Sequence, residues 1–196
     1  MKSVYNFVVT PKGERYNNKK KVGDSELILN TEIFNHQYVN REAIVISTPI
    51  IGETDIKAGD TVIVHHNVFR RWHNVKGVEK NSRSFFNEDT YFINKDQIFL
   101  YKRNKKWKAP KGYCFVKPLK AIDQFNTESE KPLQGIVKYS DGTVKIGDLI
   151  GFKPGGEYEF VVNNERIYRV LSNLITIKYE YQGDEEEYNP SWSQSS

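Results

Sequence analysis

The chain has 196 residues and carries 29 Lys and Arg against 25 Asp and Glu, which leaves a net charge of +4. That length suits one large domain or two small ones. Basic and acidic residues are nearly balanced in number, which argues against a dedicated nucleic-acid surface. No apolar run approaches the roughly 18 residues of a membrane span, and the N-terminus has no signal-peptide character. The single cysteine, Cys114, can form no internal disulfide, so we expect a reducing, cytoplasmic setting.

The first half of the chain alternates short apolar runs with polar loops. An opening strand is predicted at residues 4–9, ahead of Pro11. A long polar loop, typical of a mobile segment, follows at about residues 12–40 and carries the apolar triplet Leu27-Ile28-Leu29. Further strands are predicted at residues 43–47, 61–65, 91–93 and 98–101. An irregular stretch over residues 67–84 separates the second of these strands from the third.

The second half begins after a basic linker, residues 104–112, which ends in Pro110 and Gly112. A second set of strands is predicted within residues 113–181. Residues 182–196 combine an acidic run with a serine-rich end, a composition typical of a disordered tail. Aromatic residues make up 13% of the chain and no helical period of 3.6 residues stands out, so the predicted fold class is all-β.

One short phrase occurs twice, which predicts a duplicated β domain. Residues 56–64 and residues 144–152 each hold an apolar residue, a lysine, then Gly-Asp and a β-rich run. Gly-Asp between two such runs is turn chemistry, because glycine adopts positive φ at little cost and aspartate can bond its own backbone. The flanking segments match in the same order: residues 4–11 with 111–118, 42–45 with 134–137, and 91–100 with 168–177.

This order of segments resembles the GroES-type co-chaperonin (chaperonin-10) family, twice over. Lys57-Ala58-Gly59-Asp60 and Lys145-Ile146-Gly147-Asp148 resemble the Lys-Val-Gly-Asp segment of that family. The resemblance implies an all-β protein of two tandem GroES-like small β-barrels, over residues 1–103 and 113–181.

The resemblance also implies a binding element. In that family an apolar tripeptide on the mobile loop docks on the apical domain of a GroEL-type chaperonin. The matching residues here are Leu27, Ile28 and Leu29, although Glu26 stands where the family usually places a glycine. The second copy has no apolar triplet between residues 119 and 133, so only the first copy is expected to bind in this way.

The function that the resemblance implies is that of a co-chaperonin, a homo-oligomeric ring that caps the chaperonin and assists protein folding. We expect the protein to lie in the cytoplasm of a bacterial or phage-infected host cell, and to have no enzymatic activity and no cofactor. One alternative is a virion structural or assembly protein built on GroES-like barrels without chaperonin binding. Another is a nucleic-acid-binding small barrel that uses Arg70-Arg71-Trp72, against which the charge balance argues.

Three histidines are candidate metal ligands. His65, His66 and His73 lie close together in the sequence, but no cysteine is near them. His65 and His66 are adjacent on a predicted strand and should face opposite sides. We therefore expect no metal site, and we expect Cys114 to be a small core residue.

Overall fold

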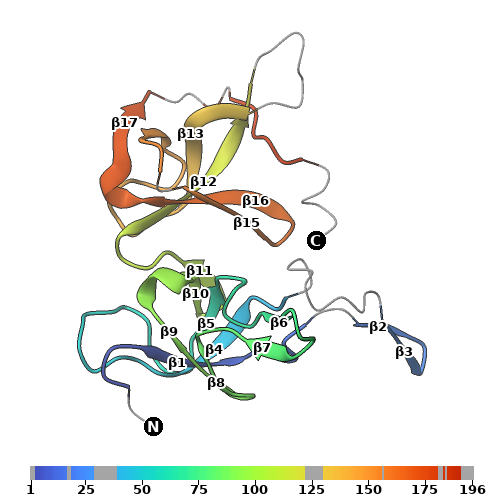
Figure 1. The fold of residues 1–196 in the computed structure, drawn as a ribbon. Helices are drawn as coiled ribbons and strands as arrows, with labels where there is room; N and C mark the ends of the chain where they lie inside the picture. Colours follow the sequence, from blue (N-terminus) through green and yellow to red (C-terminus); the bar gives the residue numbers. More distant parts are fainter. Residues whose placement is uncertain are drawn as a thin grey trace. The chain divides into compact units, whose positions relative to one another are not determined.

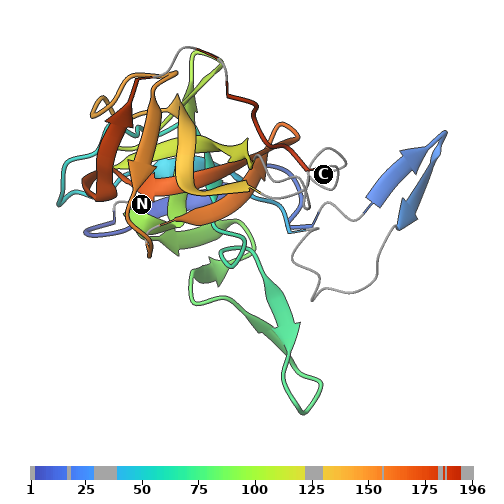
Figure 2. The same cartoon turned by 90° about the horizontal axis from the view of Figure 1, so that it is seen from above.

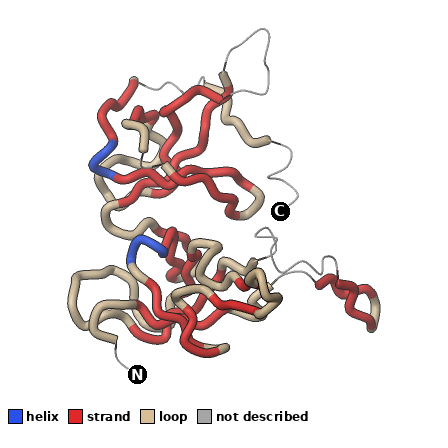
Figure 3. The backbone as a smooth tube through the Cα atoms, viewed as in Figure 1, coloured by secondary structure: helices blue, strands red, loops and turns tan. Residues whose placement is uncertain are grey.

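The computed structural model describes residues 3–16, 19–28, 39–121, 130–155, 157–180, 183 and 185–190. The chain divides into two compact units, Met1–Lys106 and Trp107–Ser196. Strands dominate both units, and the helical elements of the described residues are two short 3-10 turns, η2 (Lys95–Gln97) and η3 (Ser172–Leu174) (Figure 3). The all-β prediction is confirmed. No helix of the described residues is long and apolar enough to cross a membrane.

The first unit is built on a seven-stranded sheet with the order β11-β10-β5-β4-β1-β9-β8, whose edge strand β11 continues past the division at Lys106 (Figure 1). Its strands are β1 (Phe7–Pro11), β4 (Glu42–Ser47), β5 (Thr61–Val64), β8 (Phe85–Asn87), β9 (Thr90–Ile93), β10 (Ile98–Arg103) and β11 (Lys106–Lys108). Two further hairpins pair within themselves, namely β2 (Lys19–Val22) with β3 (Ser25–Ile28), and β6 (Arg71–His73) with β7 (Glu79–Asn81). The predicted linker therefore contains a strand: Asn104 and Lys105, both at positive φ, form a two-residue turn that returns β11 onto β10.

The second unit is built on a six-stranded sheet with the order β15-β16-β12-β13-β14-β17 (Figure 1). Its strands are β12 (Tyr113–Lys120), β13 (Glu130–Tyr139), β14 (Leu149–Phe152), β15 (Tyr158–Val162), β16 (Glu165–Leu171) and β17 (Ile175–Tyr179). Read from the other edge, this order is that of β10-β5-β4-β1-β9-β8 in the first unit. The two sheets therefore share one connectivity, and a 3-10 turn precedes the closing strand in both.

The strand registers follow the alignment that the sequence gives. Val9 pairs with Val45 in the first unit, and the aligned residues Val116 and Val137 pair in the second. The register shifts between Val8 and Val9, where β4 has the extra residue Ile46, and likewise between Phe115 and Val116, where β13 has the extra residue Lys138. Because a one-residue slip would turn every side chain to the opposite face, the shared register requires the same pattern of inward apolar residues in both sheets.

The Gly-Asp phrase of the first unit forms a compact turn before β5. The Lys57 amide donates to the Asp60 carboxylate at 2.8 Å, and the Asp60 amide donates to the Lys57 carbonyl at 3.1 Å. The Gly59 amide reaches the Val45 carbonyl at 2.8 Å. Gly59 has a φ of 88°, in the region that favours glycine.

The second phrase repeats this turn before β14. The Lys145 amide donates to the Asp148 carboxylate at 3.0 Å, and the Asp148 amide donates to the Lys145 carbonyl at 3.1 Å. The Gly147 amide reaches the Val137 carbonyl at 2.8 Å, with Gly147 at a φ of 90°. Both aspartates thus hold backbone at a turn, as the sequence predicts.

Each unit has its own buried apolar core. On β4, Ala43 and Val45 are buried while Ile44 and Ile46 are exposed, the alternation of a strand with one covered face. Other strands are covered on both faces, since Ile98–Tyr101 of β10 and Cys114–Val116 of β12 are all buried. Cys114 is fully buried, which confirms its prediction as a core residue. Neither sheet of the described residues closes on itself, so the prediction of two closed barrels is not confirmed.

Candidate functional site

The predicted binding segment lies in the hairpin β2–β3. Leu27 and Ile28 belong to β3, and their Cα atoms lie opposite those of Lys20 and Lys19. Gly23, with a φ of 62°, begins the two-residue turn of the hairpin. Part of the predicted mobile loop is thus a two-stranded ribbon. Leu29 lies outside the described residues.

The base of this loop is held by buried polar groups. Asn40 is 4% exposed, and its side-chain amide donates to the carbonyls of Lys12 and Glu14 at 3.0 and 2.8 Å. The backbone amide of Asn40 also donates to the Arg15 carbonyl at 2.9 Å, and Tyr16 pairs with Val39 in a β-bridge. These bonds bring the two ends of the loop together, since buried polar groups must find partners.

Arg15 ties the loop base to the segment that leads into β6. The guanidinium is 8% exposed and donates from Nε and Nη2 to the Phe69 carbonyl at 3.3 and 3.1 Å. Nη2 also donates to Asn81 Oδ1 at 2.8 Å, at the end of β7. The guanidinium carbon lies 5.3 and 5.5 Å from the ring centroids of Phe85 and Tyr91.

Tyr16 provides a second link between the same two segments. Its hydroxyl accepts a hydrogen bond from the Arg71 amide at 2.8 Å, and the Arg71 guanidinium lies over the Tyr16 ring. Nearby, burial raises the pKa of Tyr91 to about 12. The loop therefore leaves the first unit from a packed frame that also supports the hairpin β6–β7.

A second polar cluster lies in the second unit, where the acidic tail packs on β12. Glu187 forms an antiparallel bridge with Leu119. The Lys120 amide donates to the Glu186 carbonyl at 2.8 Å, and the Tyr188 amide donates to the Pro118 carbonyl at 2.9 Å. Three ion pairs accompany this backbone pairing: Lys117–Glu187 at 2.7 Å, Lys120–Glu186 at 3.1 Å and Lys131–Glu185 at 2.6 Å.

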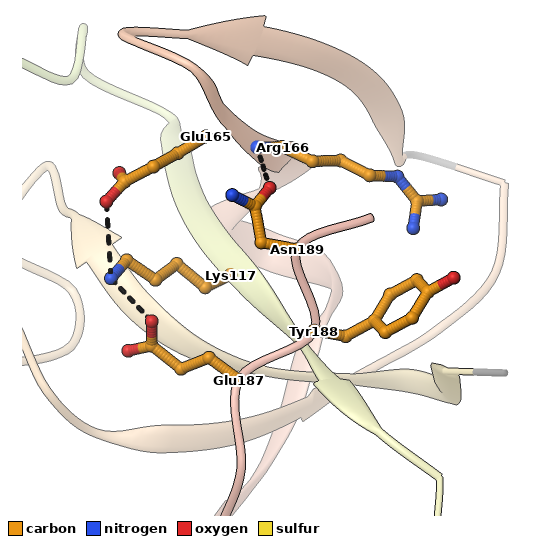
Figure 4. Close-up of a pocket in the computed structure, with 6 residues that line it drawn as sticks. All are labelled: Lys117, Glu165, Arg166, Glu187, Tyr188 and Asn189. Carbon is orange, nitrogen blue, oxygen red and sulfur yellow. Dashed lines mark hydrogen bonds and ion pairs between the residues drawn. The ribbon is translucent and has the colours of Figure 1, made fainter. Parts of the chain in front are cut away.

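The prediction of a disordered tail is therefore wrong for residues 185–190. The acidic run lies on β12 because Lys117 and Lys120 meet it, and a local charge count does not reveal that meeting. Figure 4 shows Lys117 between Glu165 and Glu187, with Asn189 bonded to the Arg166 amide. The pocket that these side chains line has a volume of about 50 Å³, room for water but not for an organic ligand.

The histidine prediction needs one correction. The strand β5 ends at Val64, so His65 and His66 lie in the turn that follows, with stacked rings 4.3 Å apart. They do not face opposite sides as predicted, because the alternation of a strand has already ended. Within the described residues no group of three or more His, Cys, Asp or Glu side chains could hold a metal ion.

Sequence reasoning did not find the residues that fix the loop base, Arg15, Tyr16 and Asn40. The hydrogen bonds Arg15–Asn81, Asn40–Glu14 and Tyr16–Arg71 join residues 66, 26 and 55 positions apart, so no local pattern could reveal them. A comparison with models of known families finds no match, and neither does a comparison with curated proteins.

Proposed function

We propose that this chain is a co-chaperonin-like protein whose first unit contacts a GroEL-type chaperonin through Leu27, Ile28 and Leu29. The observation that carries the proposal is the setting of this segment. It lies on a loop whose two ends are joined by the buried residues Arg15 and Asn40, so an apolar segment is presented from a fixed base.

The proposed fold is a tandem pair of GroES-like barrels. The shared strand order and the matched registers of the two sheets support it. So do the matching bulges of β4 at Ile46 and β13 at Lys138, because a bulge bends a strand in the way that barrel walls require.

Energetics argue that such a protein acts as a ring. Burying each of three Leu or Ile side chains contributes roughly 1.5–3 kcal/mol before costs. Ordering the loop opposes this gain, since fixing one residue of backbone costs about 1–2 kcal/mol. One loop would bind weakly, whereas several loops on one homo-oligomer bind with high avidity.

Co-sedimentation with a GroEL-type chaperonin and ATP tests the proposal. The wild-type protein should pellet with the chaperonin, and the variant Leu27→Ser/Ile28→Ser should not. Val75→Ser/Val78→Ser is the matched control, because it removes two exposed apolar residues from the other hairpin of the same unit. The proposal fails if the wild type stays in the supernatant or if both variants bind equally.

Purification of the chain from the cells that produce it tests the alternative of a virion structural or assembly protein. The pairing of the tail with β12, in a unit whose sequence has no apolar triplet between residues 119 and 133, is the observation that favours this alternative. Recovery of the chain as a stoichiometric part of a particle, without chaperonin binding, would establish it.

A further inference from the structure

The hairpin β6–β7 stands apart from the sheet of the first unit. Its strands pair only with each other in the described residues, with Trp72 opposite Lys80. Figure 2 shows it as the green ribbon that extends from the lower side of that unit. Asn74 shapes the tip, since its side-chain oxygen accepts bonds from the amides of Lys76 and Val78, both at 3.0 Å.

The hairpin and its base carry an excess of positive charge. Residues 70–83 contain five cations and one carboxylate, that of Glu79. Arg71 pairs with Glu79 at 3.5 Å. Within the described part of the chain the other four cations, Arg70, Lys76, Lys80 and Arg83, have no carboxylate partner.

We propose that the hairpin β6–β7 binds the phosphate backbone of nucleic acid. A two-stranded ribbon has the width that the major groove of a duplex admits. The four cations lie at the base, along β7 and at the tip, so they can follow a row of phosphates. This proposal does not depend on the proposed chaperonin contact.

The near balance of positive and negative charges over the whole chain is compatible with a basic surface on this hairpin. The tail carboxylates of the second unit are matched by lysines there, as the ion pairs of Glu185–Glu187 show. The net charge averages over those pairs, whereas a ligand meets the local charge of the hairpin.

A lipid surface fits the same residues less well. Val75 at the tip is fully exposed, and an apolar tip flanked by cations could enter a membrane interface. However, Arg70 and Arg83 lie about five residues from the tip, or roughly 16 Å at a strand rise of about 3.3 Å per residue. That distance is about twice the Debye length of about 8 Å at physiological salt, so Arg70 and Arg83 would not meet the lipid charge, and of the four cations only Lys76 and Lys80 would remain near it.

The test is fluorescence anisotropy of a labelled 20-base-pair DNA duplex and a single strand of equal length, titrated with the full chain. With four phosphate contacts the slope of log affinity against log salt on the duplex should be about −3.6, which is a loss of about 150-fold between 50 and 200 mM salt. Lys80→Gln/Arg83→Gln should halve the slope and reduce that loss to about tenfold. Both positions are exposed, so the core is undisturbed.

Lys111→Gln/Lys153→Gln is the matched control, because it removes two exposed cations without carboxylate partners from the second unit. Its slope should equal that of the wild type. Binding to the single strand with a similarly halved slope in the hairpin variant also supports the proposal, with Trp72 available for base stacking.

Three results would overturn it: no binding to either oligonucleotide, equal weakening by the control variant, or binding to anionic phospholipid vesicles alone that Val75→Ser/Val78→Ser abolishes.

Discussion

The two Gly-Asp turns offer a matched pair of substitutions within one chain, Asp60→Asn and Asp148→Asn. In each turn the asparagine oxygen can still accept the backbone hydrogen bond, from Lys57 or Lys145. What each substitution removes is the charge that faces a cation. The structure predicts a large effect in the first unit and a small one in the second.

The difference comes from the exposure of the partners. Arg103 donates to Asp60 from Nε at 3.2 Å and from Nη2 at 2.5 Å, and the two side chains are 27% and 9% exposed. Two charge-assisted bonds at such a site contribute about 2 kcal/mol after discounting for solvent. Lys178 pairs with Asp148 at 2.9 Å but is 57% exposed, so that pair contributes about 0.5 kcal/mol.

Amide hydrogen exchange of β5 and β14 measures the two effects in the intact chain. Protection of β5 should fall about 30-fold in Asp60→Asn, and protection of β14 about twofold in Asp148→Asn, because each 1.4 kcal/mol is a factor of ten. Equal losses in the two units would refute the argument from partner exposure.

The pH dependence provides a control on the cause. Burial alone would raise the pKa of Asp60, but the hydrogen bonds from Arg103 and the Lys57 amide outweigh burial and lower it below 3.8. Because the folded-state pKa is lowered, the stabilisation is present above the unfolded-state value. It is lost as the pH falls from about 3.8 through the lowered pKa, and the gap between wild type and Asp60→Asn should close there.

Three further predictions concern other parts of the chain. Replacing Glu185–Glu187 by Gln removes three ion pairs of about 0.2–1 kcal/mol each. The hydrogen of the Lys120 backbone amide should then exchange with solvent several-fold faster. An unchanged exchange rate would show that backbone pairing alone holds the tail. Gly135→Ala should lower the free energy of unfolding by about 1–3 kcal/mol in urea titrations, because the new Cβ would lie 2.7 Å from the Lys117 carbonyl oxygen, and a neutral result would contradict that clash. Tyr91 should ionise near pH 12 in absorbance titrations. Because its folded-state pKa is raised, the stability that it contributes is intact below pH 10 and falls by at most about 1.4 kcal/mol per pH unit above pH 10. Ionisation near pH 10 would rule out its burial.

The framework of both sheets could be predicted from the sequence because its signals are local and repeated. Apolar alternation placed β4, β5, β9 and β10 within one to two residues of their ends. The aligned phrases then predicted which residues occupy equivalent places, and the pairing of Val9 with Val45 and of Val116 with Val137 agrees. Glycine and aspartate at a turn leave few other conformations, so the turn was predictable as well.

The additions to this framework were not predictable, because they depend on contacts between distant residues. The strands β6 and β7 are three residues long and too short to show alternation, so the segment looked irregular. The composition of the tail predicts disorder, because a local charge pattern does not include the lysines of β12. Part of the linker became β11 through a turn with positive φ at Asn104 and Lys105, where local composition indicates only a solvated basic segment.

The positions of these additions carry a consequence for function. Loops tolerate insertion where a rigid sheet supports them, and binding residues concentrate there. In the first unit the base of the loop bearing β2–β3 and the base of β6–β7 share one set of buried bonds, since Arg15 reaches the Phe69 carbonyl and Asn81 while Tyr16 reaches the Arg71 amide. Two segments with separate proposed ligands thus stand on one packed frame. Opening that frame would disturb both, whereas substitutions outside the frame, such as Lys80→Gln or Leu27→Ser, should separate their activities.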